Sequence, residues 1–438
     1  MKLYQTFHTV IDDVDAHGRG TATAEGRILA VPFAFPGDEV DVRPAHREHG
    51  ILVCELVALT HPSPWRVAPQ CDHADRSGGC FWQSVAYEKQ LEWKRMIAQM
   101  FFDAAGVFLT VPEIIPSTHL FEFRNKMEFA IGEGPKIGTK APGKWWEIVD
   151  MDGCLLLSQE SREVVRRVRA FLAQHRVPLW NARQHQGYAR YLVIREGKFT
   201  HERMVTLITA PGALPGAEDL AALLHPLTTS LYHGINFSLS DTAFADTLTL
   251  LAGDPYLHEQ VGALKLAISP NSFFQTNSFM IEKLMGAVED LLQLSPREKL
   301  LDLYCGLGLF SLHYAPLCAQ VIGIEAAQEA VAMAMRNQET NKISNVDFKA
   351  GRVEDLSWVS PWADAAIVDP PRAGLHPDVI EAFIKCGPQR FVYVCCNPKA
   401  FAREMAALQA AYRVTAMRAL DLFPHSPHVE LVVRLERI

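Results

Sequence analysis

The stretch Asp302-Leu303-Tyr304-Cys305-Gly306-Leu307-Gly308-Leu309-Phe310 decides the fold. It stands at the end of a short apolar run that begins at Lys299. Two glycines between a strand and a helix let the backbone approach a ligand closely, at the carboxyl edge where parallel sheets bind. The stretch therefore predicts the first strand-to-helix turn of a ligand-binding sheet.

Outward from this turn, short apolar runs alternate with helical patterns to the end of the chain. The runs cover residues 299–304, 321–324, 366–368, 391–394 and 429–434. The helical patterns cover residues 327–341, 377–385 and 399–411. A β-α-β-α order implies a parallel, doubly wound sheet. We therefore predict an α/β, Rossmann-like domain over residues 259–438.

The remainder of the chain divides into two further predicted domains. Residues 1–62 alternate short apolar strands with Gly and Pro turns, which predicts a small OB-like β-barrel. Such a barrel is either an RNA-binding module or an accessory. A proline-stiffened linker around residues 60–64 leads to a mixed α+β central domain, residues 63–258. Its segment from about 83 to 114 is a candidate for packing with the C-terminal domain.

Composition limits the classes of function. The 438 residues hold 42 Lys and Arg against 50 Asp and Glu, a net charge of −8 that excludes indiscriminate binding to nucleic acid. Residues 161–205 hold ten basic and three acidic side chains. This segment is either a phosphate-binding surface or a solvated helix followed by an ordinary strand.

The compartment follows from the chain start, the apolar runs and the cysteines. The first residues show no apolar signal region, and no apolar run reaches 18 residues. Nine scattered cysteines do not form a disulfide framework. We expect a cytoplasmic protein with reduced thiols and no membrane partner.

The second predicted strand of the sheet indicates the kind of cofactor. It ends in Glu325, 19 residues after Gly306, where a carboxylate can accept hydrogen bonds from both ribose hydroxyls of a nucleoside. Ser311 stands where a dinucleotide motif has its third glycine. This weakens a pyrophosphate cofactor and favours a nucleoside without phosphates, such as S-adenosylmethionine. The spacing of Glu325 argues against the alternative, a tight turn that binds nothing.

Three further motifs end predicted strands or begin the last one. They are Asp369-Pro370-Pro371-Arg372, Cys395-Cys396-Asn397-Pro398 and His428-Val429-Glu430. The prolines hold Asp369 rigidly at the crevice. Enzymes that methylate exocyclic amines have an aromatic residue after Pro-Pro, so Arg372 argues against an amino-methyltransferase and against DNA as a partner. The alternative interpretation is two buried cysteines and a solvated glutamate.

The three motifs together fit one reaction. C5 of uracil is a poor nucleophile, and a thiolate that adds to C6 turns the ring into an enolate-like species whose C5 accepts a methyl group. A general base must then remove the C5 proton so that the thiol is released. The chain offers a thiol and two carboxylates for these tasks.

The ordered motifs resemble the RNA uracil-C5 methyltransferases that use S-adenosylmethionine. The resemblance covers nearly the whole chain and includes a TRAM-like barrel, a Cys-rich segment, Phe123-Arg124-Asn125-Lys126 and Phe273-Phe274-Gln275-Thr276-Asn277. It implies that Cys396 is the nucleophile and Glu430 the base. The implied cofactor residues are Gln275, Tyr304, Glu325 and Asp369. The implied RNA contacts are Arg124, Lys126 and Phe274.

The Cys-rich segment departs from the family pattern. Many members hold a 4Fe-4S cluster on four cysteines, and the matching positions here are Cys71, Ser77, Cys80 and Cys154. Four thiolates are the usual ligands of such a cluster, and a serine oxygen is a poor substitute. A cluster with an unusual fourth ligand, a labile three-thiolate cluster and no cluster all stay open.

The resemblance also bears on the substrate. We expect RNA, with a uridine of 23S ribosomal RNA as first choice because a TRAM-like barrel accompanies the ribosomal branch more often than the bacterial transfer-RNA branch. The alternatives are the T-loop uridine of transfer RNA and a non-catalytic RNA-binding assembly factor. A monomer is favoured.

Overall fold

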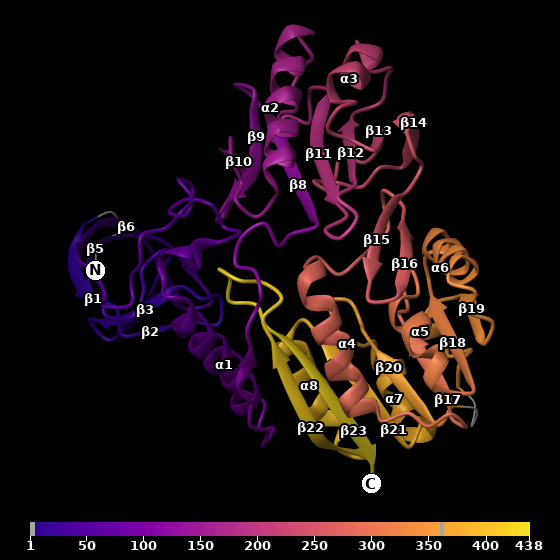
Figure 1. Ribbon diagram of the computed structural model, residues 1–438. Helices are drawn as coiled ribbons and strands as arrows, with labels where there is room; N and C mark the ends of the chain where they lie inside the picture. The colour runs from indigo at the N-terminus through magenta and orange to yellow at the C-terminus, as the bar shows by residue number, and fades with distance from the viewer. Residues whose placement is uncertain (1–4, 360–362) are drawn as a thin grey trace.

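The computed structural model describes residues 5–359 and 363–438. Three large sheets form three bodies (Figure 1). The N-terminal sheet lies to one side, a central sheet stands above, and the C-terminal sheet lies below it. Among the described helices, none is both long and apolar enough to cross a membrane.

The N-terminal sheet is curled into a small barrel, as predicted. Its strands are β1 (Phe7–Val10), β2 (Asp13–Val14), β3 (Gly20–Ala24), β4 (Arg27–Val31), β5 (Glu39–Glu48) and β6 (Ile51–His61). Three register shifts between the two longest strands, β5 and β6, bend them around the core. Alternate residues such as Val40 and Val42 point inward, as the two-residue period of a strand requires.

The central sheet has seven strands in the order β10-β9-β8-β11-β12-β13-β14. They are β8 (Lys126–Gly132), β9 (Lys136–Ala141), β10 (Lys144–Asp150), β11 (Ala189–Glu196), β12 (Arg203–Thr209), β13 (Ser230–Ile235) and β14 (Thr247–Gly253). Helices α2 (Gln159–Gln174) and α3 (Ala217–Leu224) pack on one face, where Leu192 and Ile194 of β11 join their core. Tyr191 and Val193 point to the opposite face.

The C-terminal sheet is the predicted doubly wound sheet, in the order β19-β18-β17-β20-β21-β23-β22-β7. Its strands are β7 (Ile114–Ile115), β17 (Lys299–Leu303), β18 (Gln320–Glu325), β19 (Val346–Ala350), β20 (Ala365–Val368), β21 (Arg390–Cys395), β22 (Tyr412–Leu420) and β23 (Glu430–Arg437). β23 runs antiparallel between β21 and β22, and the five strands from β19 to β21 are parallel.

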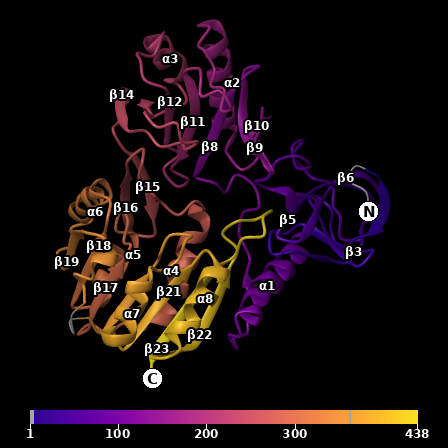
Figure 2. The ribbon, with the colours of Figure 1, turned by 180° about the vertical axis from the view of Figure 1, so that it is seen from behind.

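Helices cover both faces of the C-terminal sheet (Figure 2). Helices α4 (Ser278–Leu292), α5 (Leu309–Tyr314) and α6 (Gln328–Thr340) share one apolar core with it. Helices α1 (Tyr87–Ala104), α7 (Pro377–Cys386) and α8 (Pro398–Leu408) share the other. A hairpin of β15 (Leu257–Val261) and β16 (Leu264–Ile268) leads from the central sheet into the first of these cores.

Helix α1 connects the barrel to the C-terminal sheet. Its Trp93 stacks on Phe35 of the barrel at a ring-centroid distance of 6.1 Å, and its Phe102 packs against Phe401 of α8. Strand β7 follows α1 and pairs with the outer edge of β22. A chain segment far from the C-terminus in sequence thereby completes the C-terminal sheet.

Candidate active site

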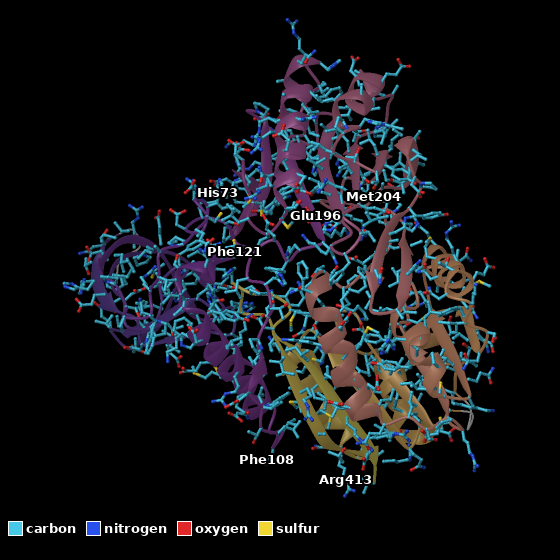
Figure 3. All side chains as sticks on the ribbon, in the orientation of Figure 1. His73, Phe108, Phe121, Glu196, Met204 and Arg413 are labelled. Atoms are coloured by element: carbon cyan, nitrogen blue, oxygen red, sulfur yellow. The ribbon has the colours of Figure 1, made fainter. Side chains whose placement is uncertain are left out.

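The carboxyl ends of the central parallel strands meet at one edge of the C-terminal sheet. Leu303 pairs with Ile324 on one side and Val368 on the other, so the residues after these strands are neighbours. Cys395 pairs with Leu431 across the antiparallel junction, which places Cys396 and Glu430 at the same end of adjacent strands. The sequence motifs therefore converge on one edge. In Figure 3, Arg413 and Phe108 lie at the bottom of the molecule, at the opposite end from this edge of the sheet.

The glycine turn after β17 has the geometry of a nucleoside site. Tyr304, Gly306 and Gly308 all adopt positive φ, the last at 90°. Glu325 accepts hydrogen bonds from the amides of Gly306 (3.2 Å) and Ala327 (2.8 Å), which fixes its carboxylate beside the turn. The buried hydroxyl of Tyr304 has no partner within the described residues. An unsatisfied hydroxyl and a fixed carboxylate fit a nucleoside ligand.

Ser311 has a structural role that the sequence did not indicate. Its hydroxyl donates a 2.6 Å hydrogen bond to Asp302, which is fully buried at the base of the turn. Burial raises the pKa of Asp302 to about 7, and the serine hydroxyl opposes that rise. The residue that replaces a dinucleotide glycine therefore satisfies a buried carboxyl.

Asp369 follows β20, and a residue of a motif distant in sequence holds its side chain. The side-chain amide of Gln275 donates to Asp369 at 3.0 Å, while Asn125 donates to the Gln275 carbonyl at 2.7 Å. Burial raises the pKa of Asp369 to about 7, and the nearby Asp302 raises it further. The Phe-Arg-Asn-Lys and Phe-Phe-Gln-Thr-Asn boxes thus meet at this carboxyl.

Cys396 and Glu430 lie together in a poorly solvated site. Cys396 is half-buried and lines a small pocket with Pro370, Pro371 and Asn397. Burial raises the pKa of the Cys396 thiol to about 12, with Glu430 the largest charged contributor. Glu430 is buried, and its burial raises the pKa of this carboxyl well above the ordinary range.

Arg372 supplies positive charge to the site, a contribution that the sequence did not predict. Its guanidinium lowers the pKa of both Cys396 and Glu430, opposing the effect of burial. The side chain of Asn397 donates to the Arg372 carbonyl at 2.8 Å and accepts from Ala400 at the start of α8. The Asn-Pro motif therefore ties the thiol strand to the Asp-Pro-Pro-Arg loop.

The three residues expected at RNA lie in different surroundings. Half-buried Arg124 forms an isolated backbone β-bridge with Asn277, and the Lys126 ammonium forms an ion pair with Glu128 at 2.5 Å. Phe274 is 4% exposed within the core of the C-terminal sheet, whereas its neighbour Phe273 is 66% exposed. Burial of Phe274 does not favour a direct RNA contact, and Phe273 has the free ring.

The Cys-rich segment offers three thiols and one serine at the four positions expected to hold an iron–sulfur cluster. Cys71, Cys80 and Cys154 are buried, and burial raises the pKa of Cys80 to about 12 and of Cys154 to about 11. The Ser77 hydroxyl already bonds Thr139 at 3.3 Å. Within the described part of the chain, no group of three or more His, Cys, Asp or Glu side chains is arranged to hold a metal ion.

The basic segment, residues 161–205, is mostly neutralised. Arg166 and Arg167 pair with Glu163, and Arg169 pairs with Asp150 at 2.7 Å. Three further arginines of the segment are buried, namely Arg190, Arg195 and Arg203. The segment does not present its positive charges as one phosphate-binding surface.

Comparisons with known proteins agree with this geometry. A family model described as tRNA (Uracil-5-)-methyltransferase matches residues 260–438. The tRNA (uracil(54)-C(5))-methyltransferase of Pyrococcus abyssi is 37% identical over 93% of this chain and 95% of its own. An uncharacterized RNA methyltransferase of Nanoarchaeum equitans is also 37% identical, over 100% of this chain and 93% of its own.

A solved structure matches the whole arrangement. The crystal structure of the Pyrococcus abyssi tRNA (uracil-54, C5)-methyltransferase in complex with S-adenosyl-L-homocysteine gives a TM-score of 0.81 at 33% identity. The match covers 98% of this chain and 100% of the other.

Fold and site together define an RNA methyltransferase that depends on S-adenosylmethionine. The chain belongs to the tRNA (uracil-5-)-methyltransferase family, and it methylates C5 of uracil in RNA.

Proposed function

We propose that the substrate is the T-loop uridine of transfer RNA, the alternative that the sequence left open, rather than 23S ribosomal RNA. The main support is that three relatives from Pyrococcus species, 36–37% identical to this chain, are named for uracil 54 of tRNA. The ribosomal preference rested on the barrel. The match to the tRNA (uracil-54, C5)-methyltransferase covers 98% of this chain, so it includes the barrel. A barrel therefore does not favour ribosomal RNA here.

The reaction assigns one task to each residue of the edge. The Cys396 thiolate forms a bond to C6 of the uracil, and the electron pair of the C5–C6 double bond moves onto the ring and its O4. S-adenosylmethionine supplies the electrophilic methyl group that C5 takes, and when its S–CH3 bond breaks the electron pair stays on sulfur and S-adenosylhomocysteine leaves as a neutral thioether. Glu430, which must be ionised at this step although burial raises its pKa, then removes the C5 proton, the C5–C6 double bond re-forms, and Cys396 leaves as thiolate.

The remaining predicted residues hold and orient the cofactor and the target base. Glu325 accepts from the ribose of the cofactor, and Tyr304 supplies a side chain with a free hydroxyl beside it. Gln275 and Asp369 form one hydrogen-bonded unit at the junction of cofactor and base. Arg372 favours the thiolate, because its charge lowers the pKa of Cys396.

Product mapping tests the substrate. The full-length protein is incubated with labelled S-adenosylmethionine and a tRNA transcript, and 5-methyluridine is located by mass spectrometry. We expect one methylated T-loop uridine, and none when that uridine is replaced by cytidine. Methylation of 23S ribosomal RNA with an unmodified tRNA would contradict the proposal.

Paired variants test the covalent step. Cys396→Ser should lower the methylation rate by at least about a thousandfold, because the weaker nucleophile cannot form the C6 adduct; at about 1.4 kcal/mol for each tenfold, this is about 4 kcal/mol of activation free energy. The neighbouring Cys395→Ser is the matched control and should keep the rate within about tenfold. Glu430→Gln should accumulate a protein–RNA adduct that survives denaturing electrophoresis, because the methylated adduct cannot lose its C5 proton. Full activity of Cys396→Ser would exclude the mechanism.

A further inference from the structure

The central sheet carries a pocket that the proposed reaction does not use. It measures about 330 Å³ and lies on the face opposite α2 and α3, where Ala130 and Tyr191 form part of its floor. That volume is at the lower end of the range for small-ligand sites. Gly132 at the pocket and Lys126 near the active-site junction are the two ends of β8, about 20 Å apart at about 3.3 Å per residue. The pocket is therefore separate from the active site.

Two consecutive tryptophans line this pocket because the edge strand is irregular. The pairing of β10 with β9 shifts register between Lys144 and Ile148. Neighbouring residues of a regular strand point to opposite faces, and a bulge re-aims them. Trp145 and Trp146 both line the pocket, at exposed fractions of 49% and 38%. Their rings are perpendicular, with centroids 5.8 Å apart.

Cations accompany the aromatic rings. The Arg183 guanidinium lies over the Trp146 ring at 4.3 Å, and the Arg190 guanidinium lies over Trp180 at 4.4 Å. Arg190 is buried and fixed by the Ser238 carbonyl at 2.6 Å, whereas Arg183 is exposed. Planar guanidinium groups and tryptophan rings are the surfaces on which unpaired RNA bases stack.

The acidic side chains of the pocket are already partnered. Asn181 donates to Glu133 at 3.0 Å, Lys144 pairs with Glu147, and Lys140 pairs with Asp241. Within residues 5–359 and 363–438, Arg183 and Lys136 make no ion pair. Two cations are therefore free to meet a phosphate, which favours a nucleotide over an uncharged aromatic ligand.

We propose that this pocket binds one unpaired nucleotide of the substrate RNA, at a distance from the methylated uridine. The base stacks on Trp146, and Arg183 and Lys136 meet its phosphate. The inference rests on the proposed function only in that the ligand is RNA. Its role is affinity and placement, so a loss at the pocket should raise the dissociation constant without slowing the chemical step.

The test compares two exposed tryptophans, each with a cationic side chain lying over its ring. Trp146→Ala and Arg183→Ala in the full-length protein should each raise the dissociation constant of the tRNA transcript about tenfold, the cost of losing one stacked base. The single-turnover methylation rate at saturating RNA should not change. Trp146→Phe should keep the dissociation constant within about threefold of wild type. The matched control is Trp65→Ala, because Trp65 is 45% exposed under Lys89 (4.2 Å) on another face, and it should leave binding unchanged.

The outcomes separate the pocket from the choice of substrate. If 23S ribosomal RNA proves to be the methylated species, its transcript replaces tRNA in the binding assay, and the pocket is still tested. Unchanged binding by both Trp146→Ala and Arg183→Ala would overturn the pocket. An equal loss with Trp65→Ala would also overturn it, since the effect would then not be local.

Discussion

Two carboxyl groups that favour their protonated forms define the chemistry at the residue scale. Burial raises the pKa of both groups, Asp302 raises that of Asp369 further, and Asp369 raises that of Glu430, where Arg372 opposes the rise. Such a cluster stores unfavourable free energy that binding of a positively charged cofactor relieves. A site arranged for ligands is therefore less stable when they are absent.

Replacement of Asp369 should reveal this stored cost. Its pKa is about 7 in the folded protein against an ordinary 3.8, so the folded state binds more protons than the unfolded state between about pH 4 and 7. Stability then falls as pH rises through that window. Asp369→Asn has no such proton, and its melting temperature should rise relative to wild type from pH 5 to pH 8, while methylation is lost.

Thermal unfolding without cofactor at the two pH values measures this difference. Asp347→Asn, on the exposed edge strand β19, is the matched control. Its melting temperature should differ from that of wild type by the same amount at pH 5 and at pH 8. An equal difference between wild type and Asp369→Asn at both pH values would contradict the prediction.

Residue-level motifs were predictable where chemistry demands a particular side chain. The meeting of Cys396, Glu430 and Glu325 at one edge of the sheet was predictable, because each stands at a strand end in a recognisable motif. Arg372 was noticed only for the chemistry it excludes, since its charge on Cys396 depends on how two loops fold together. The burial of Phe274 rather than Phe273 was equally hidden, because neighbouring aromatic residues look alike in sequence.

At the scale of elements, α1 supports the loop that leads to Glu430. Lys94 of α1 is fully buried and donates to Asp421 at 2.5 Å and to the Phe423 carbonyl at 2.9 Å. Tyr87 also donates to Asp421, at 2.9 Å. Since this loop leads directly into β23, the helix helps to set the position of the predicted base.

Removal of one member of this buried pair should be costly. Lys94→Met leaves Asp421 buried without its cation, which should lower the free energy of unfolding by about 3–5 kcal/mol. Lys89→Ala, which removes an ion pair to exposed Glu92 on the same helix, should cost less than about 1 kcal/mol. Urea denaturation of both variants measures the contrast, and equal losses would contradict it.

The elements of the C-terminal sheet were partly predictable from periodicity. The strands around the glycine turn have continuous apolar runs because both faces of the sheet are covered. β7 was not identifiable as a strand of this sheet, since two residues carry no period and pair only with β22. For the central domain the sequence predicted only a mixed α+β fold. The order of its strands was not predictable, because it depends on long-range pairing.

At the scale of the molecule, charge pairing limits the electrostatic part of RNA binding. We propose three domains with boundaries near residues 62 and 258, one for each large sheet. The central one contains the segment with ten basic residues, yet most of these are buried or paired. Stacking and shape must therefore contribute much of the affinity.

The salt dependence of binding tests this distribution. Ten phosphate contacts to a single strand would give a slope of about −7 in a plot of log K against log salt concentration. We expect a slope smaller in magnitude than about 4, measured by equilibrium binding of the tRNA transcript across KCl concentrations. A slope near −7 would show that the arginine pairs open to meet phosphates.

Strand β7 and helix α1 have a consequence for how the chain is made. Both leave the ribosome before the central sheet, yet their partners in the C-terminal sheet, β22 and α8, are synthesised near the end. The apolar face of α1 must wait for these partners through most of translation. The barrel, stacked on the same helix at Trp93, offers the first available cover. An early domain thus covers one side of α1, at Trp93 and Ile97, while the side with Ala98 and Phe102 waits for the last domain.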